Sequence, residues 1–255
     1  MLTRISKAVA RRLLSREGYY FFRAYLDLDE PHVRDQPRVM AAYSTSGSRD
    51  LDLMYHPTDR ECVIDGSLKI VSSDYVRRCH LDVISGYLPD RGRVLEVGCG
   101  NAINLIELRK MNPNLEFFGV DYVPQRLEQA QKYFGADLDG IHLQEGDVQH
   151  LDFNDKSFDV VFSIHCLEQC ERILSKAVSE ILRVAKKVVH IEPDFQNSNY
   201  AQRKFLKSRD YLRSLRRELL AHSDWKTTVS GLDTYFNPLN RSGLFVSSPP
   251  VSEAR

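Results

Sequence analysis

The chain has 255 residues, enough for one large domain or for one domain with a small cap. Apolar residues make up 42 % of the sequence and charged residues 27 %, values typical of a soluble globular protein without a membrane-spanning segment. The 35 Lys and Arg residues balance the 35 Asp and Glu residues, so no overall field would draw the protein to nucleic acid.

The N-terminal segment, residues 1–25, is basic and amphipathic. Ile5, Val9 and Leu13 lie four residues apart, on one face of a helix. Its basic residues before the first acid are Arg4, Lys7, Arg11, Arg12 and Arg16. Three alternatives stay open: a helix docked on the body of the protein, a helix on an anionic membrane surface, and an Arg-rich mitochondrial presequence.

Residues 1–71 contain no repeat and no alternation of strands and helices, so we expect a mostly helical extension or cap there. The remainder, residues 72–250, is predicted to form one α/β domain. It opens with a helix over residues 72–88, where serines suit the N-cap and apolar residues recur at helical spacing.

From residue 93 onward, strands and helices alternate. We expect strands at residues 93–97, 116–120, 141–145, 158–164 and 186–192. We expect helices at about residues 101–111, 124–134 and 171–184. Apolar strands separated by helices indicate a parallel sheet that is covered on both faces.

The C-terminal part adds a long helix near residues 200–221 and two strands around an Asn-Pro-Leu-Asn turn. An antiparallel hairpin is an allowed end for a parallel sheet. The sequence therefore predicts an α/β fold with a doubly wound, mostly parallel, seven-stranded sheet that closes with this hairpin.

The first predicted strand runs into a glycine turn, in "RVLEVGCGNAINLIEL", residues 93–108. Gly98 and Gly100 lack a Cβ, so the backbone there can approach a ligand closely. A dinucleotide fingerprint needs a third glycine where this chain has Ile103, and no Lys-Ser or Lys-Thr of a P-loop follows. The turn is thus a poor cradle for a diphosphate.

Acidic residues follow the next two predicted strands. Asp121 ends the second strand, where a carboxylate can accept hydrogen bonds from both hydroxyls of a ribose. Asp147 follows the third strand, where it can accept a hydrogen bond from an exocyclic amine such as that of adenine. Together with the turn, these acids suit a nucleoside without a pyrophosphate.

With these motifs in order, the sequence resembles the class I S-adenosylmethionine-dependent methyltransferases, and their small-molecule branch in particular. "VLEVGCGNA", "GVDYVPQRLEQAQ" and "EGDVQHLDFNDKSFDVVFSIHCLEQC" are similar to that family's first motif and to its later strands and loops. The resemblance covers about residues 72–194 and the closing "NPLNRSGLFV". It implies a Rossmann-like methyltransferase fold, S-adenosylmethionine as cofactor and methyl transfer as activity.

The resemblance also implies roles for single residues. Gly98 and Gly100 would let the backbone meet the methionine part of the cofactor. Glu96 would lie near the cofactor's ammonium group, directly or through other residues. Asp121 would hold the ribose, and Tyr122 would pack beside the adenine.

Four further residues receive implied roles at the cofactor. Asp147 would accept a hydrogen bond from the adenine amine, and Val148 would supply a backbone N–H. Ser163 and His165 would lie beside the cofactor at the end of the fourth strand.

Methyl transfer from a sulfonium is an in-line displacement, so the protein must align acceptor and methyl group and, for some acceptors, remove a proton. His165 is the candidate base because histidine titrates near neutrality. Glu192 and Asp194, on either side of Pro193, are further catalytic candidates. Related sequences commonly carry Leu-Glu-His where this chain has Leu167-Glu168-Gln169, so any role of that histidine does not carry over to this chain.

Aromatic residues are frequent in residues 1–92 and about 195–240, which we expect to form the acceptor pocket. A small, partly apolar acceptor, methylated at oxygen, is the expected substrate. The basic run in residues 200–221 is expected to be solvated, and contact with a lipid headgroup or RNA is the alternative. Nucleic acid is not the expected partner, because the net charge is zero and no RNA-binding module is visible.

Two other function classes compete with this hypothesis. The same fold could hold the cofactor without turnover and serve as a binding or scaffold protein. An NAD-dependent oxidoreductase is disfavoured by Ile103 and by the lack of a Tyr-x-x-x-Lys set.

The five cysteines lack the paired spacing of a disulfide framework and the spacing of a metal site, so we predict no metal and a reducing compartment. We expect a cytoplasmic protein. Peripheral membrane contact through the basic N-terminal helix and a mitochondrial address remain the alternatives, and the oligomeric state is not predicted.

Overall fold

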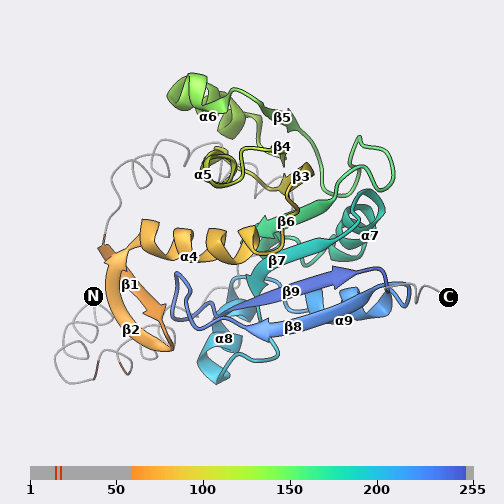
Figure 1. Cartoon of the computed structure of the whole chain (residues 1–255). Coiled ribbons are helices and arrows are strands. Elements are labelled where there is room, and N and C mark those ends of the chain that lie inside the picture. Colours follow the sequence, from red (N-terminus) through yellow and green to blue (C-terminus); the bar gives the residue numbers. More distant parts are fainter. Residues whose placement is uncertain (1–14, 16–17, 19–58, 251–255) are drawn as a thin grey trace.

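The computed structural model describes residues 59–250 together with Ser15 and Gly18. A seven-stranded sheet runs through this part in the order β5-β4-β3-β6-β7-β9-β8 (Figure 1). Strands β3 to β7 pair in parallel, whereas β9 is antiparallel to both β7 and β8. The doubly wound, mostly parallel sheet with an antiparallel end is therefore confirmed. The strands are β3 (Gly92–Val97), β4 (Leu115–Asp121), β5 (Ile141–Glu145), β6 (Val160–Ile164), β7 (Val188–Pro193), β8 (Lys226–Gly231) and β9 (Ser242–Ser248).

Helices cover both faces of the sheet. Successive strand residues point to opposite faces, so Val94 packs in a core cluster with residues of α4, α5 and α6, while Leu95 packs in another with residues of α7 and α9. The helices are α4 (Ser73–Ser85), α5 (Ile103–Met111), α6 (Pro124–Phe134), α7 (Leu174–Val184), α8 (Tyr200–Ser208) and α9 (Leu215–Ala221).

Local sequence signals explain where several helices begin. The Ser72 hydroxyl accepts a hydrogen bond from the N–H of Asp74 and caps α4. Helix α6 begins at Pro124, whose fixed φ suits the first turn. The side chain of Asn199 accepts from the N–H of Gln202, whose own side chain accepts in return, so a capping box starts α8.

The strand order fixes where a ligand can bind. The chain winds outward from β3 through β4 to β5, then returns to β6, beside β3, and winds the other way to β7. In open α/β sheets, ligands bind beyond the carboxyl ends of the strands at such a switch point. The glycine turn after β3 and the segment after β6 meet there.

Residues 59–72 form a hairpin, so the expectation of helix is wrong for this stretch. Strand β1 (Asp59–Ile64) pairs with β2 (Ser67–Ser72) around Asp65 and Gly66, which both have positive φ. An Asp-Gly pair between apolar, β-branched residues is a strong hairpin signal. We expected helix here because residues 1–71, taken together, show no alternation of strands and helices. The predicted boundary between residues 71 and 72 stays a prediction.

The expected long helix over residues 200–221 is also wrong, because the chain breaks between α8 and α9. Asp210 has a φ of 52°, which no helix continues through. The Glu171 carboxylate accepts hydrogen bonds from the N–H groups of Arg213 and Ser214, so a residue distant in sequence stabilises the break. The break turns Leu212 into the core, where it has no exposed surface.

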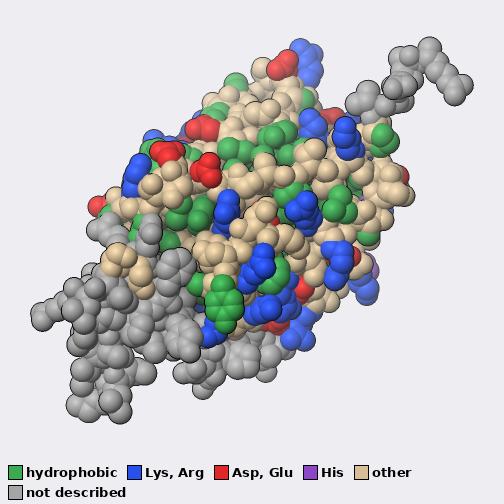
Figure 2. Space-filling model, turned by 90° about the horizontal axis from the view of Figure 1, so that it is seen from below, with side chains coloured by type: hydrophobic (Ala, Val, Ile, Leu, Met, Phe, Trp, Pro, Cys, Tyr) green, Lys and Arg blue, Asp and Glu red, His purple; other side chains and the backbone are tan. Residues whose placement is uncertain are grey.

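The face that carries α8 is rich in Lys and Arg side chains, which lie around apolar ones (Figure 2). Several of these cations have partners within the protein. Arg203 and Lys207 each lie 5.7 Å from the ring centre of Phe195, and Arg172 pairs with Asp210. Some basic side chains of residues 200–221 therefore make contacts within the protein.

The expected basic helix over residues 1–25 lies outside the described residues, apart from Ser15 and Gly18. Among the helices that are described, none is long and apolar enough to cross a membrane.

Candidate active site

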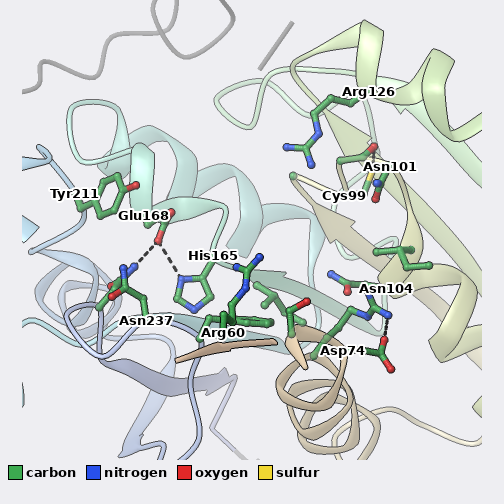
Figure 3. A pocket seen from close by; sticks show the side chains of 18 residues that line it. Arg60, Asp74, Cys99, Asn101, Asn104, Arg126, His165, Glu168, Tyr211 and Asn237 are labelled. Carbon is green, nitrogen blue, oxygen red and sulfur yellow. Dashed lines mark hydrogen bonds and ion pairs between the residues drawn. The ribbon is translucent and has the colours of Figure 1, made fainter. Parts of the chain in front are cut away.

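A cavity of about 430 Å³ lies at the carboxyl ends of β3 and β6 (Figure 3). One end is formed by the glycine turn, Gly98–Asn101, and the start of α5. The other end is formed by β1, the start of α4, the segment after β6 and the loop between β8 and β9. The cavity therefore joins the predicted cofactor turn to residues from these four other parts of the chain.

Gly98 and Gly100 adopt left-handed conformations, with φ of 69° and 56°. A Cβ on Gly98 would overlap Cys166 Sγ, so this glycine is required by packing as well as by backbone conformation. A Cβ on Gly100 would lie 2.6 Å from Nη2 of Arg126, the end of a flexible side chain. Gly100 is therefore the position where the backbone faces movable atoms.

Glu96 lies beneath the turn and is 1 % exposed. Its Oε1 accepts a hydrogen bond of 2.7 Å from Nδ2 of Asn104, while its buried Oε2 has no partner among the described residues. Burial raises the pKa of Glu96 to about 8, against the opposing hydrogen bond from Asn104. Glu96 itself does not line the cavity, whereas Asn104, which donates to it, does. The unpartnered Glu96 oxygen fits a cationic N–H group of a ligand at the turn, met directly or through other residues.

Asp121 ties the end of β4 to the turn. Its Oδ2 accepts from the N–H of Gly100 at 2.7 Å, and its Oδ1 accepts from the N–H of Val123 at 2.9 Å. The residue is 7 % exposed, and Tyr122 beside it is half-buried. The turn and the predicted ribose-binding carboxylate are thus in direct contact.

Asp147 and Val148 follow β5 at the same edge of the sheet. Oδ1 of Asp147 accepts from the N–H of Gln149 at 2.9 Å. The half-buried Val148 packs against the core. Asp121, Tyr122, Asp147 and Val148 do not line the described cavity, which ends at the turn.

His165 lines the cavity just after β6, with a φ of 52°. Its Nδ1 lies 3.0 Å from Oε2 of Glu168, and its Nε2 lies 2.9 Å from Oγ of Ser242. Burial lowers the pKa of His165, but the hydrogen bond to Glu168 and the charges of Glu168 and Glu192 outweigh it, so the pKa lies above 6.5. The same Glu168 oxygen accepts from Nδ2 of Asn240 at 2.8 Å.

Ser163 and Glu192 lie deeper than the sequence suggests. Both have no exposed surface, and the Ser163 hydroxyl donates to Oε1 of Glu192 at 2.6 Å and lies 2.9 Å from Nδ1 of His190. Burial raises the pKa of Glu192 to about 7. The remaining donors to its carboxylate are the backbone N–H groups of Cys166, Leu167 and Glu168. These contacts hold the short 3₁₀ helix η2 (Leu167–Gln169) in place and leave Glu192 out of the cavity lining.

Asp194 is likewise fully buried and outside the cavity lining. Its Oδ2 accepts from Nδ2 of Asn197 at 2.7 Å, and its carbonyl oxygen accepts from the hydroxyl of Ser198. The extended turn at Pro193 therefore aims this carboxylate at its own loop and not at an acceptor.

The structure adds cavity residues that were not among the predicted site residues. Arg60 comes from β1, Arg77 from α4, Glu168 from η2, Tyr211 from the break after α8, and Phe236 from the loop between β8 and β9. Each reaches the cavity through tertiary packing of an element far away in sequence. The aromatic composition of residues 195–240 pointed to the segments that carry Tyr211 and Phe236, and the Asp-Gly hairpin signal could have placed Arg60. No comparable signal marks Arg77 or Glu168.

Comparison with known proteins identifies the domain. Residues 94–188 match the family described as "Methyltransferase domain". Demethylmenaquinone methyltransferase of Deinococcus radiodurans is 42 % identical over 69 residues, which are 27 % of this chain and 29 % of that protein. Phthiotriol/phenolphthiotriol dimycocerosates methyltransferase of Mycobacterium leprae is 29 % identical over 158 residues, 53 % of this chain and 56 % of that protein. The matched part of the chain thus spans 29 % of the length of the first of these curated relatives and 56 % of the second.

Solved structures agree on the fold. The cyclase SpnF matches with a TM-score of 0.63 at 14 % identity, over 88 % of this chain and 99 % of its own. Magnesium protoporphyrin IX methyltransferase from Synechocystis, with S-adenosylhomocysteine bound, matches with a TM-score of 0.59 at 15 % identity, over 84 % of this chain and 99 % of its own. One of these neighbours is named a cyclase, so the fold alone does not fix the reaction.

The family match shows that residues 94–188 form a methyltransferase domain, and the sheet order and the solved structures show that the chain has the fold of the class I S-adenosylmethionine-dependent methyltransferases.

Proposed function

We propose that this protein transfers the methyl group of S-adenosylmethionine to a hydroxyl group of a small, partly apolar acceptor, with His165 as the base. The observation that carries the proposal is the cavity of about 430 Å³, which reaches both the glycine turn and His165. A donor at the turn and an acceptor beside His165 would share one cavity, and such alignment supplies much of the acceleration of a displacement.

At the turn, the residues fit the methionine part of the cofactor. The backbone of Gly98 and Gly100 would pass close to it. Glu96 would meet the ammonium group directly through Oε2, which lacks a donor, or indirectly through Asn104, which donates to Oε1. A cation beside this carboxylate would favour its ionised form and so remove the cost of burying a charge.

At the ends of β4 and β5, the residues fit the nucleoside. Asp121 would accept hydrogen bonds from the ribose, since each carboxylate oxygen has a lone pair left after its backbone bond. Tyr122 would pack beside the adenine, Asp147 would accept from its amine, and Val148 would offer its N–H. We assign Ser163 a different task, because its hydroxyl is committed to Glu192 and His190.

When bound, S-adenosylmethionine supplies an electrophilic methyl group. The protein's part is to orient the acceptor hydroxyl toward that methyl group and to take its proton. Nε2 of His165 would receive the proton in exchange for its bond to Ser242, and Glu168 on Nδ1 would stabilise the resulting imidazolium. Glu192 and Asp194 act as positioning residues in this account, since they hold the segments after β6 and β7.

The proposal is tested by label transfer from tritiated S-adenosylmethionine to a panel of phenols, alcohols, amines and carboxylic acids. We expect label in a hydroxyl acceptor with the natural protein, and much less with His165→Ala, while S-adenosylhomocysteine binds both proteins equally. Label in an amine, or full activity of His165→Ala, would refute this assignment. A protein that binds the cofactor and labels nothing would favour the binding or scaffold function.

A further inference from the structure

We infer that the acceptor carries an anionic group, a carboxylate or a phosphate, which Arg60 binds beside His165; this assignment rests on the proposed function. Arg60 belongs to β1 and lines the cavity. Figure 3 shows its side chain reaching into the cavity between His165 and Asn104. The cation therefore stands where an acceptor must pass or lie.

The hairpin holds Arg60 firmly. Val63 exchanges backbone hydrogen bonds of 3.0 and 2.9 Å with Tyr235 in the loop between β8 and β9. Cys62 and Ile64 are buried and pack in a cluster with Val76 of α4. Hydrogen bonds on one side and packing on the other fix the backbone of β1 at Arg60. Less conformational entropy is therefore lost when the arginine binds a ligand.

The charges of the cavity leave Arg60 without an anion. The carboxylate of Asp74 pairs with both Arg77 and Arg78, and that of Glu168 accepts from His165 and Asn240. No ion pair or hydrogen bond joins the Arg60 side chain to any described residue. Among the described residues, three arginines and two carboxylates line the cavity, so the fixed charge that these residues supply favours an anionic ligand.

Arg60 lies at the acceptor end of the cavity, beside His165 (Figure 3). The ring of Phe236 lies 6.2 Å from the ring of His165 and 5.2 Å from that of the buried His80, which gives this end an aromatic wall. Arg126 lies at the opposite end, against the glycine turn. An acceptor with an apolar ring against Phe236 and an anionic group on Arg60 would place its hydroxyl near His165.

The inference is tested by calorimetric titration of the protein saturated with S-adenosylhomocysteine. The probes are 4-hydroxybenzoate, phenyl phosphate and the neutral 4-hydroxybenzyl alcohol. The variants are Arg60→Met, which removes the charge, Arg60→Lys, which keeps it, and Arg91→Met, a matched change at an exposed residue just before β3 that does not line the cavity. Because the cofactor product is already bound, its own carboxylate does not compete.

We expect at least one anionic probe to bind with saturation and to lose about tenfold or more in affinity in Arg60→Met, as for a charged hydrogen bond. The loss should be smaller in Arg60→Lys and absent in Arg91→Met, and S-adenosylhomocysteine should bind every variant alike. Which anionic probe binds distinguishes a carboxylate from a phosphate. Equal binding of anionic and neutral probes, or no saturable binding of either anion, would overturn the inference.

Two further outcomes separate this inference from the proposed function. If Arg60→Met loses affinity for S-adenosylhomocysteine, Arg60 holds the cofactor and the inference is wrong, while methyl transfer stands. If the natural protein does not bind S-adenosylhomocysteine, the proposed function fails, and the inference fails with it.

Discussion

At His165, two carboxylates outweigh burial in setting the pKa, and Glu168 contributes more than Glu192. Glu168 holds Nδ1, and its hydrogen bond and charge oppose the effect of burial on the pKa of the imidazole. A base must be neutral to accept a proton, so a raised pKa moves the onset of activity to higher pH.

We therefore expect kcat to rise with pH through a pKa above 6.5. Glu168→Gln removes the negative charge beside Nδ1 and so lowers the pKa of His165. The rising limb of the kcat–pH profile should shift to lower pH, and its plateau should be lower. The measurement is the pH dependence of kcat for an acceptor found by label transfer. An unshifted limb in Glu168→Gln would show that another group titrates.

Glu96 links cofactor binding to a proton. With a pKa of about 8 its carboxyl is mostly protonated at pH 7, whereas the cofactor's ammonium group would favour the carboxylate. Binding at pH 7 should therefore release most of one proton from the natural protein and none from Glu96→Gln. Calorimetry in buffers of different ionisation enthalpy measures this release, and equal values for the two proteins would exclude Glu96 from the ammonium site.

Among the elements, η2 depends on a carboxylate from a different strand. Glu192 at the end of β7 accepts from three successive N–H groups of the segment after β6, so the site loop is fastened by one buried side chain. Backbone N–H groups that lose such a partner in the interior are costly.

Glu192→Gln keeps one acceptor oxygen and puts an NH₂ group against a backbone donor. At pH 8, where the Glu192 carboxyl is mostly ionised, we expect a loss of about 1–3 kcal/mol in the free energy of unfolding. Urea denaturation measures the loss, with Glu128→Gln at an exposed helix position as the control. Equal stability of the two variants would contradict the anchoring role of Glu192.

The central elements could be predicted from sequence because their signals are local. Apolar runs gave β3 to β7, Pro124 marked the start of α6, and the glycine turn marked the end of β3. The break after α8 was not predictable in this way. Glu171, which lies in the segment before α7, accepts a hydrogen bond from the backbone N–H of Arg213, and Asp210 adopts a positive φ. Local periodicity cannot see such a contact.

The site divides along the same line. The positions of the glycine turn and of Asp121 were predictable because they lie at strand ends within one continuous stretch, while their roles toward a cofactor stay a prediction. Arg60 and Glu168 were missed as site residues because they reach the cavity only once the hairpin and η2 are packed. Glu192 and Asp194 follow a strand as a catalytic acid would, but burial commits both to holding loops.

In the whole molecule, the switch point of the sheet brings the two halves of the cavity together. Strands β3 and β6 are neighbours, so the cofactor turn after one faces His165 after the other. The segments that follow β7 and the β1–β2 hairpin close the acceptor side. We therefore expect S-adenosylmethionine to bind at this edge of the sheet.

The most direct test is calorimetric titration of the protein with S-adenosylmethionine and S-adenosylhomocysteine, with NAD as a control ligand. Asp121→Ala serves as the matched variant, with its fold checked by circular dichroism. We expect micromolar binding of both sulfur nucleosides, a large loss in Asp121→Ala and no binding of NAD. Failure of the folded natural protein to bind either sulfur nucleoside would contradict this expectation.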